Sequence, residues 1–411
     1  MTAKSSSDKN KAILLVCDGL GDRPSAGGKT PLQAAFTPNL DELSESGING
    51  LIDVISPGIV PGSDTAHLAL FGYDPYRYYP GRGVFEVLGA NMELNEGDVA
   101  FRANFATVDE KMRVIDRRAG RKGSKILAEV LDGLEIDGIK ISLKNTTQHR
   151  CALVLKGEQL SRDVSDVDTH EAGDIVQECK PLKDDKAARK TAAIVNKFVR
   201  KSYELLNYHT VNAERREKGE PPANIILLRG AGSYESITSL KERFGFSAAC
   251  IAGASLYKGV AKYLGMKVLN IESATGKSDT NLKDKAEAAL QALEVYDFVF
   301  VHVKDTDNSG HDGDFEGKRD IISRVDAELV ARIKDVDGYI VVTGDHSTPV
   351  TLKRHCSDPV PVVIHGEGVR TDDVNKFDEI SAASGGLNRI RGVDLMPMLA
   401  DYMGYYIMYG T

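Results

Sequence analysis

The sequence contains no tryptophan, few cysteines and no long apolar run, and these absences exclude several classes of protein. No window approaches the ~18 consecutive apolar residues of a membrane-spanning helix. The five cysteines show no C-x-x-C spacing, which favours free thiols. The first residues, MTAKSSSDKN, lack the apolar stretch of a signal peptide. We therefore expect a cytoplasmic protein without a membrane partner and with a short disordered tail before Lys11.

Basic residues are also too few for a nucleic-acid-binding protein. The net charge is −8, whereas general binding of nucleic acids requires an extended basic face. Small anionic substrates are not excluded, because local clusters of basic residues decide their binding. With 411 residues, the chain can form one large domain with an inserted one, or two ordinary domains.

Short apolar runs, rich in β-branched residues and bounded by glycine or acids, recur along the chain. Their hydrophobicity is continuous rather than alternating, which is typical of parallel strands buried on both faces. The runs are AILLVCDG from Ala12, NIILLRG from Asn224, KVLNI from Lys267, FVFVHVKD from Phe298, YIVVTGD from Tyr339 and VPVVIHG from Val360. Helical patterns, the longest over 188–206, 284–293, 315–335 and 393–403, lie between or after them. The alternation predicts an α/β fold with a doubly wound, mostly parallel sheet.

The middle of the chain has a different pattern. Between about Val108 and Asp174, short strand-like pieces alternate with many charged and turn residues. This pattern predicts a smaller α+β domain that is inserted as a cap over the edge of the sheet. We therefore expect residues 1–107 and 175–411 to form the main domain together, and residues 108–174 to form the cap.

Acids and histidines follow several of the predicted strands. They are Asp18, Asp307, His311, Asp345, His346 and, just before the last strand, His355. Sites in open α/β sheets form at the carboxyl ends of strands, so these side chains are expected to converge. Carboxylates and imidazoles bind zinc, manganese and related divalent ions. Two such ions about 4 Å apart can clamp a phosphoryl group during its transfer.

One serine lies at a turn that leads into a predicted helix, in the stretch PGSDTAHL from Pro61. A serine hydroxyl is a weak nucleophile at neutral pH, but coordination to a metal favours its alkoxide. Backbone N–H groups at the start of a helix also attract a phosphate. We therefore expect Ser63 to be the nucleophile of a phosphoryl transfer. His67, one helical turn later, either approaches this site or packs in the core.

Each of these residues also has a structural explanation when it is considered alone. A serine at the start of a helix is more often an N-cap than a nucleophile, and an acid after a strand is more often a turn or cap residue. His209, His302 and His365 are expected to be structural. The joint occurrence of the motifs, in this order along the chain, favours a metal site.

This set of motifs resembles the alkaline-phosphatase superfamily of metalloenzymes, and within it the archaeal-type cofactor-independent phosphoglycerate mutases. The motifs are DGLGDRP, GGKTPLQAAFTPNLD, PGSDTAHLALFGYDP, GRGVFE, FRANFATVD, IDRRAGR, KDTDNSGHDGD and TGDHSTP. The resemblance extends from about Ala12 to about Met403. It implies a sheet of alkaline-phosphatase type with a cap. It also implies the interconversion of 3-phosphoglycerate and 2-phosphoglycerate, a step of glycolysis and gluconeogenesis, through a phosphoserine at Ser63.

The resemblance further implies how two divalent metal ions share their ligands. One ion would be bound by Asp307, His311 and His355, and the other by Asp18, Ser63, Asp345 and His346. Manganese is the expected ion, with cobalt, zinc or magnesium as alternatives, and no free bisphosphoglycerate is required. The expected partner is the phosphoglycerate substrate, without nucleic acid or membrane, and a homo-oligomer is left open.

Phosphoglycerate carries a phosphate and a carboxylate, both of which arginine binds through paired hydrogen bonds. The densest basic stretch, KMRVIDRRAGRK from Lys111, resembles the arginine-bearing loop of the family, although such a run is usually a solvated surface. The candidate substrate-binding residues are Arg117, Arg121, Arg118, Arg102, Arg82, Asp168, His170 and Lys258. Two alternatives stay open. One is a metal-dependent phosphomonoesterase or phosphotransferase that acts on another small phosphorylated alcohol, and the other is a non-catalytic protein that retains metals for stability.

Overall fold

The computed structural model describes residues 10–25, 27–119, 123–405, 408 and 410. The tail that we expect to be disordered, apart from Asn10, and Arg121 lie outside the described residues. The chain divides into two compact units. The first unit comprises the residues up to Tyr79 and from Ile237 onward, and the second comprises Pro80–Ser236.

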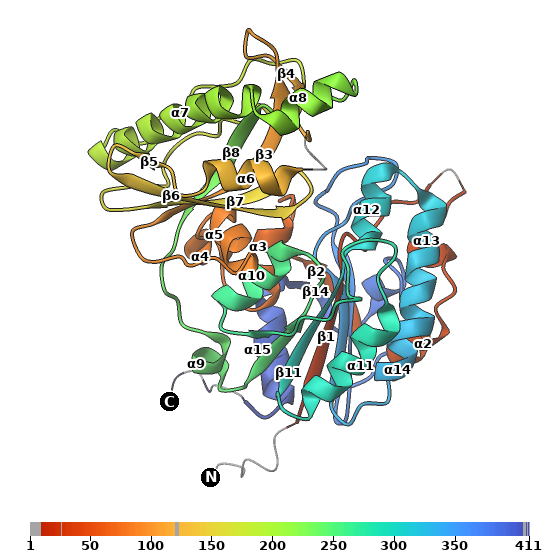
Figure 1. Ribbon diagram of the computed structural model, residues 1–411. Coiled ribbons are helices and arrows are strands. Elements are labelled where there is room, and N and C mark those ends of the chain that lie inside the picture. Colours follow the sequence, from red (N-terminus) through yellow and green to blue (C-terminus); the bar gives the residue numbers. More distant parts are fainter. Residues whose placement is uncertain (1–9, 26, 120–122, 406–407, 409, 411) are drawn as a thin grey trace. The chain divides into compact units, whose positions relative to one another are not determined.

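The first unit is built on a sheet in which the described strands have the order β10-β9-β11-β1-β12-β13-β2-β14 (Figure 1). Their bounds are β1 (Ala12–Cys17), β2 (Ile48–Asp53), β9 (Ala248–Ile251), β10 (Lys267–Val268), β11 (Phe298–Val303), β12 (Tyr339–Gly344), β13 (Val360–His365) and β14 (Asn388–Arg391). The central strands β11, β1 and β12 are parallel and buried along their whole length, as their continuous hydrophobicity predicts.

Strand β13 departs from the prediction, because it runs antiparallel to both of its neighbours, β12 and β2. The expectation that the run from Val360 is parallel is therefore wrong. A strand buried on both faces has the same apolar sequence in either direction, so hydrophobicity could not reveal its orientation.

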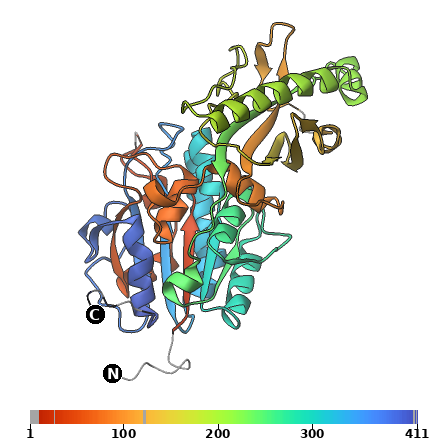
Figure 2. The ribbon, with the colours of Figure 1, turned by 90° about the vertical axis from the view of Figure 1, so that its left-hand side faces the viewer.

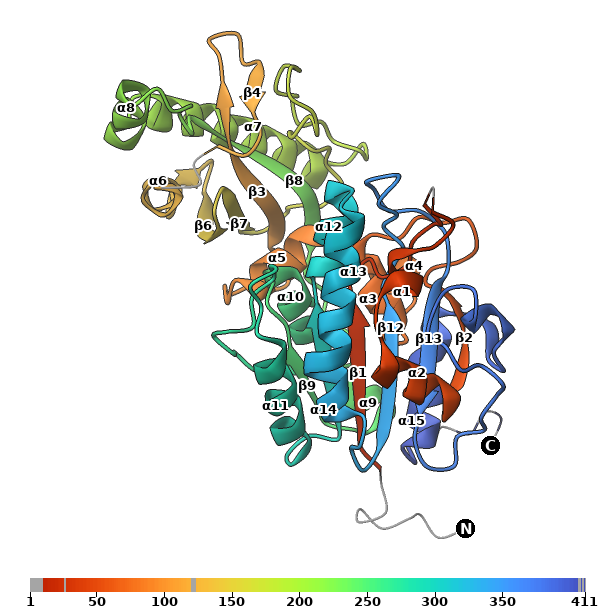
Figure 3. The same cartoon turned by 90° about the vertical axis from the view of Figure 1, so that its right-hand side faces the viewer.

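Helices cover both faces of this sheet, which confirms the doubly wound α/β fold (Figure 3). Val299 and Val301 of β11 share a core with residues of α11, α13 and α14. The alternate residues Phe298 and Phe300 pack on the other face against Phe71, which caps the end of α3. The helices of this unit are α1 (Pro31–Ala34), α2 (Pro38–Glu45), α3 (Ser63–Leu70), α4 (Pro75–Tyr78), α9 (Leu240–Phe244), α10 (Ser255–Tyr263), α11 (Leu282–Leu293), α12 (Asp305–Asp312), α13 (Phe315–Arg324), α14 (Ala331–Ile333) and α15 (Gly392–Tyr402).

The second unit is an α+β structure with its own antiparallel sheet and its own core. Its strands are β3 (Val99–Val108), β4 (Val114–Asp116), β5 (Glu135–Ile136), β6 (Ile139–Thr147), β7 (Arg150–Lys156) and β8 (Ile225–Ser233). Strand β3 pairs with both β7 and β8, and the long helix α7 (Lys186–Asn207) packs on β8 (Figure 2). The other helices are α5 (Arg82–Gly89), α6 (Ser124–Leu131) and α8 (Thr210–Glu217).

This unit is wider than the segment 108–174 that we predict as the inserted domain. The difference arises from the flanking strands β3 and β8, which pair with each other in the antiparallel sheet and so belong to it. The expectation that NIILLRG, the run from Asn224, belongs to the main parallel sheet is wrong for the same reason. Its apolar residues are buried under α7 instead, and burial by a helix gives the same sequence pattern as burial in a parallel sheet.

All five cysteines lie among the described residues, where they are buried and free of disulfides. None of the described helices combines the length and the apolar character that crossing a lipid bilayer requires.

Candidate active site

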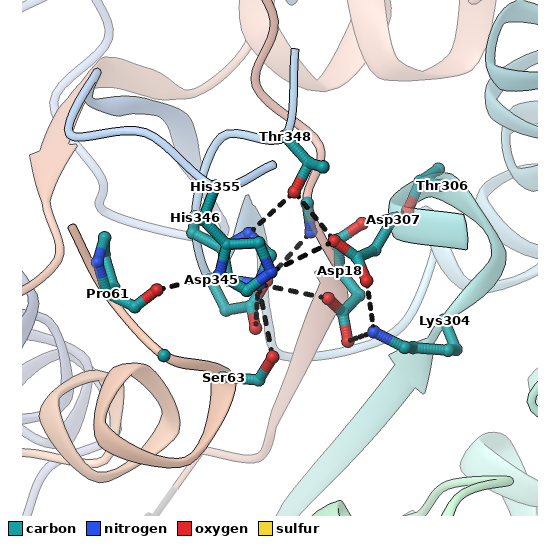
Figure 4. A network of polar contacts seen from close by, with 12 residues as sticks. Asp18, Pro61, Ser63, Lys304, Thr306, Asp307, Asp345, His346, Thr348 and His355 are labelled. Atoms are coloured by element: carbon teal, nitrogen blue, oxygen red, sulfur yellow. Dashed lines mark hydrogen bonds and ion pairs between the residues drawn. The ribbon is translucent and has the colours of Figure 1, made fainter. Parts of the chain in front are cut away.

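Three neighbouring strands of the first unit end at the same level of the sheet. The pairing register aligns their last residues, which are Cys17 of β1, Val303 of β11 and Gly344 of β12. The residues that follow them, Asp18, Lys304 and Asp345, therefore leave the sheet side by side at its carboxyl edge (Figure 4). This is the arrangement that the sequence predicts for its acids, and it also brings Lys304, which the sequence does not predict, beside Asp18 on the side opposite Asp345.

One group of candidate ligands consists of Asp307 and His311, one turn apart on α12, and of His355. Both imidazole Nε2 atoms lie 3.5 Å from Asp307 Oδ1. The Nδ1 atoms donate hydrogen bonds to backbone carbonyls, from His311 to Lys353 (3.0 Å) and from His355 to Pro61 (2.9 Å). The Nδ1 protons are thereby fixed, so the Nε2 lone pairs face the carboxylate, as in histidines that bind metal ions.

The second group contains Asp18, Asp345 and His346, which are completely buried. His346 Nε2 lies 3.3 Å from Asp18 Oδ1 and 3.4 Å from Asp345 Oδ2. The hydroxyl of Thr348 determines the tautomer of His346. It donates its single proton to Asp307 Oδ1 (2.7 Å), so it accepts the proton of His346 Nδ1 (3.0 Å). His346 Nε2 consequently presents a lone pair to the carboxylates. The candidate ligand atoms of Asp18, Asp307 and His346 lie within 4.8 Å of one another.

Ser63 is the first residue of α3 and lies beside the second group (Figure 4). Its Oγ is 3.2 Å from His346 Nε2, and because this nitrogen carries a lone pair, the serine hydroxyl donates the hydrogen bond. In the described structure Gly62 is the N-cap of α3, and no side-chain hydrogen bond caps this helix. The alternative explanation, in which Ser63 is only an N-cap, is therefore wrong.

His67 forms part of this site rather than a separate part of the core. Its Nδ1 donates a hydrogen bond to the backbone carbonyl of Ser63 (2.7 Å) and lies 3.5 Å from Asp345 Oδ2. Burial, followed by the nearby His302, lowers the pKa of His67 to about 3, so the ring is neutral at physiological pH. A neutral imidazole can fix the turn at Ser63 without adding charge to the site.

The buried carboxyl groups of Asp18 and Asp345 lie close together, and their pKa values shift in opposite directions. Burial opposes the ionisation of Asp18, but the charge of Lys304 and a hydrogen bond from His302 hold its pKa well below the ordinary value. Burial, together with the Asp18 carboxylate, raises the pKa of Asp345 well above its ordinary value. Asp18 Oδ1 and Asp345 Oδ2 are buried and have no hydrogen-bond partner among the described residues. A cation would stabilise these buried oxygens in their ionised form, so this donor set fits divalent metal ions.

Two glycines allow the site loops to approach each other closely. Gly19 has φ +62°, and a Cβ at this position would lie 2.8 Å from Asp307 Oδ1. A Cβ at Gly310 would lie 2.4 Å from the carbonyl oxygen of Thr348. Any larger residue at either position would push the candidate ligands apart.

Three donors around Asp18 were not among the predicted site residues. Tyr257, His302 and Lys304 all donate hydrogen bonds or an ion pair to Asp18 Oδ2. The sequence predicts a structural role for His302, whereas its Nε2 lies 3.0 Å from Asp18 Oδ2. The only signal in the sequence is its position just before the carboxyl end of a buried strand, which a structural histidine can share. Lys304 directly follows the same strand. No motif in the sequence indicates Tyr257 as a site residue. It lies on α10, which is far from Asp18 in the sequence.

In the second unit, three of the predicted substrate-binding residues lie together. Arg117 forms two parallel hydrogen bonds with Asp168, of 3.0 and 2.9 Å. Arg229 Nη1 lies 3.7 Å from Asp168 Oδ2 and 3.3 Å from His170 Nδ1. The sequence does not predict Arg229 as a site residue, because its run NIILLRG has the pattern of a strand of the parallel sheet. Asp168 thus organises two guanidinium groups, and a second acid, Asp166, pairs with His170 (3.2 Å).

Two further predicted arginines share a different acid in the same unit. Arg82 Nε lies 3.3 Å and Arg102 Nη1 3.7 Å from Glu86 Oε1. Burial lowers the pKa of Arg102, an effect that Glu86 opposes and the charges of Arg82 and Arg229 reinforce. The arginines of the two pairs are therefore close enough to repel one another, and a bound anion would relieve this repulsion.

The remaining predicted substrate residues are not part of these pairs. Arg118 donates its backbone N–H to Asp116 Oδ1 (2.8 Å). Lys258 belongs to the first unit, where its Nζ donates to Asn270 Oδ1 (3.3 Å).

The chain is similar to known proteins over nearly its whole length. Residues 10–402 match the family model of the metalloenzyme superfamily. The chain is 48% identical to 2,3-bisphosphoglycerate-independent phosphoglycerate mutase 1 of Methanocaldococcus jannaschii, over 98% of this chain and 100% of that protein. It is 49% identical to the 2,3-bisphosphoglycerate-independent phosphoglycerate mutase of Methanopyrus kandleri, over 96% of both chains.

Solved structures give the same relationship. A protein from Pyrococcus horikoshii is similar with a TM-score of 0.87 and 39% identity, over 98% of this chain and 100% of that one. The cofactor-independent phosphoglycerate mutase of Thermoplasma acidophilum is similar with a TM-score of 0.70 and 38% identity, over 95% of this chain and 99% of that one.

Proposed function

The chain belongs to the 2,3-bisphosphoglycerate-independent phosphoglycerate mutases of the metalloenzyme superfamily, and from this membership we propose that it interconverts 3-phosphoglycerate and 2-phosphoglycerate through a phosphoserine at Ser63. It is thus an isomerase with a small-molecule substrate, and it acts in glycolysis and gluconeogenesis. The observation that carries the role of Ser63 is its position: a buried, non-capping hydroxyl 3.2 Å from His346, next to unpaired carboxylate oxygens.

Seven side chains are proposed to hold two divalent ions. Asp307, His311 and His355 form one set of ligands, and Asp18, Ser63, Asp345 and His346 form the other. Manganese is the proposed ion, with cobalt, zinc or magnesium as alternatives, because mixed nitrogen and oxygen ligands suit these metals better than calcium. When bound, such ions lower the pKa of the serine hydroxyl and neutralise charge on the phosphoryl group.

The reaction is a double transfer that consumes no co-substrate. Ser63 Oγ forms a bond to phosphorus while the bond from phosphorus to the 3-oxygen of glycerate breaks, and the serine proton passes to that oxygen. The 2-oxygen of the retained glycerate then attacks the phosphoserine while the bond from phosphorus to Ser63 breaks. The proton of the 2-hydroxyl passes to Ser63 Oγ, and the 3-hydroxyl keeps the proton that it received in the first transfer. The phosphoryl group that leaves the 3-oxygen is the same one that the 2-oxygen receives from Ser63, so free bisphosphoglycerate is not needed.

The phosphoserine has to be protected from water, since its hydrolysis would convert the mutase into a phosphatase. Ser63 is only 6% exposed, and the neighbouring His67 and Asp345 are completely buried. The hydrogen bond from His67 to the Ser63 carbonyl also keeps the nucleophile in place between the two half-reactions.

The arginines of the second unit are the proposed binding groups for the anionic ends of the substrate. Arg117 and Arg229 around Asp168, and Arg82 and Arg102 around Glu86, supply an excess of guanidinium groups. Each guanidinium can bind a carboxylate or phosphate through two hydrogen bonds. Arg121 stays a proposed substrate-binding residue together with Arg117, and Arg118, His170 and Lys258 are proposed for weaker contacts.

The role of Ser63 is tested by following labelled phosphate. The parent enzyme, given 3-phosphoglycerate with a labelled phosphoryl group, should return the label in 2-phosphoglycerate, and acid quenching should trap label on Ser63. Ser63→Ala should show neither, and its rate should fall at least about 1,000-fold. The metal content of the variant must be measured as well, because the hydroxyl is a proposed ligand. Mutase activity that persists in Ser63→Ala, or label trapped on a histidine, would contradict the proposal.

A further inference from the structure

The two carboxylate oxygens of Asp18 have opposite environments. Oδ2 accepts from three donors of different elements: Tyr257 of α10, His302 of β11 (3.0 Å) and Lys304, which follows β11 (3.2 Å). Oδ1 is buried, has no hydrogen-bond partner among the described residues, and lies 3.3 Å from His346 Nε2. The protein therefore saturates one oxygen of Asp18 and leaves the other toward the candidate metal ligands.

The donors on Oδ2 are held rigidly. The rings of Tyr257 and His302 are stacked with their centroids 3.5 Å apart, and both residues are almost completely buried. The His302 Nδ1 atom is also buried and has no partner among the described residues. Because the carboxylate can only accept, His302 Nε2 carries the proton, and Nδ1 is left as an unpaired acceptor. The unpaired Nδ1 of His302 costs stability, but the same tautomer gives Asp18 a hydrogen-bond donor at Nε2.

Lys304 extends this arrangement to the other ligand group. Its ammonium group pairs with Asp307 Oδ2 as well as with Asp18 Oδ2. Asp307 Oδ1, by contrast, faces His311, His355 and the hydroxyl of Thr348. One lysine therefore occupies the Oδ2 atoms of two carboxylates, and both present their Oδ1 atoms toward histidine nitrogens.

We propose that Tyr257, His302 and Lys304 restrict Asp18 to binding a metal ion through one oxygen, and that this restriction makes the site select manganese-like ions over calcium. The inference rests on the proposed metal site of Asp18. Calcium takes six to eight oxygen ligands and often uses both oxygens of a carboxylate. A carboxylate with one oxygen committed to three protein donors cannot serve it in this way, whereas an ion that also accepts nitrogen ligands needs only one oxygen.

Tyr257→Phe tests the proposal with a minimal change, since it removes one donor to Oδ2 and retains the ring that stacks on His302. The affinities of the metal-depleted protein for Mn²⁺ and for Ca²⁺ should be measured separately by titration calorimetry. Manganese binding should weaken about 10- to 100-fold, the range typical for the loss of a group that orients a ligand. Calcium binding should weaken less or strengthen, so that the ratio of the two affinities falls.

Tyr73→Phe is the matched control. Tyr73 is also a buried tyrosine of the first unit, and its hydroxyl donates to the backbone carbonyl of Thr238 (2.8 Å), away from the ligands. This variant also loses one buried tyrosine hydroxyl, here a donor to a neutral carbonyl, but it should retain the parent ratio of affinities. A second pair of variants addresses His302: His302→Gln can keep an N–H donor and should retain most of the selectivity, whereas His302→Leu should lose it.

The outcomes separate this inference from the proposed function. If the parent protein binds neither ion, the proposed metal site itself fails. If the parent binds manganese and both Tyr257→Phe and His302→Leu keep its manganese-to-calcium ratio, the metal site stands and the inference on Asp18 is overturned. An equal change of the ratio in Tyr73→Phe would also overturn it, because the effect would then be one of general destabilisation.

Discussion

The two units of this chain position their polar side chains in opposite ways. In the first unit, the proposed ligands follow the level ends of buried parallel strands, so short side chains such as Asp18 and Asp345 meet with little freedom. In the second unit, long side chains such as Arg102 and Arg229 project from antiparallel strands and are held by acids. Metal ligands require positions accurate to a fraction of an ångström, whereas a guanidinium group can reach an anion from several backbone positions.

The difference predicts which unit responds to which change. Chemistry should depend on the first unit, where a lost ligand cannot be replaced by a neighbour. Substrate binding should depend on the second unit. Several arginines are proposed to bind the substrate there, so the substitution of one arginine should reduce substrate binding only in part.

Removal of the metal ions should have the largest effect and should be confined to the first unit. Treatment with a chelator should abolish mutase activity, and manganese, cobalt or zinc should restore it better than calcium. Metal binding should also raise the unfolding temperature of the first unit and leave that of the second unchanged, since ligands stabilise only the structure they bind. Activity assays and scanning calorimetry measure the two effects. Full activity in thoroughly metal-free protein would end the two-metal model.

Arg117→Ala should have an intermediate effect and should leave the metal content unchanged. Each lost charge-assisted hydrogen bond is worth roughly 1.5–3 kcal/mol, so kcat/KM should fall about 10- to 100-fold. Arg189→Ala is the control, because Arg189 forms an exposed ion pair with Asp184 in the same unit and should change kcat/KM by less than about twofold. If Arg117→Ala and Arg189→Ala behave alike, the Arg117 region is only a solvated surface.

The smallest expected effect concerns the pH dependence of stability in the first unit. Glu379 accepts hydrogen bonds from the Thr30 hydroxyl (2.8 Å) and the Asp22 backbone (3.0 Å), and burial of its carboxyl group raises its pKa from 4.5 to about 7. The folded protein retains a proton between these values that the unfolded chain releases. The free energy of unfolding should therefore fall as the pH rises from about 4.5 to about 7, by about 1–3 kcal/mol.

Glu379→Gln cannot ionise, so this part of the pH dependence should disappear in the variant. Denaturant unfolding of both proteins at pH 5 and pH 8 measures the change. Identical pH dependence in parent and variant would show that Glu379 does not hold its proton in the folded protein.

The sequence was most informative where short motifs coincide with strand ends. The acids after β1, β11 and β12 could be predicted to converge because parallel strands end at one edge, and the fold class followed from the same buried runs. Strand direction could not be predicted for β13, nor sheet membership for β8, because burial by any neighbour gives the same apolar pattern. Tyr257 cannot be predicted from the sequence, because only the folded chain brings α10 against Asp18.

The central position of β1 has a consequence for the synthesis of this chain. Ala12 pairs with Phe298 and Tyr339, so β1 cannot join its sheet until residues about 290 or more positions downstream have been synthesised. At roughly 5–20 residues per second, this delay amounts to about 15–60 s on the ribosome. The second unit, which is continuous from Pro80 to Ser236, can complete its own sheet during that time. We expect the nascent chain to carry a folded second unit together with the exposed apolar segment AILLVC, which is a natural binding site for a chaperone.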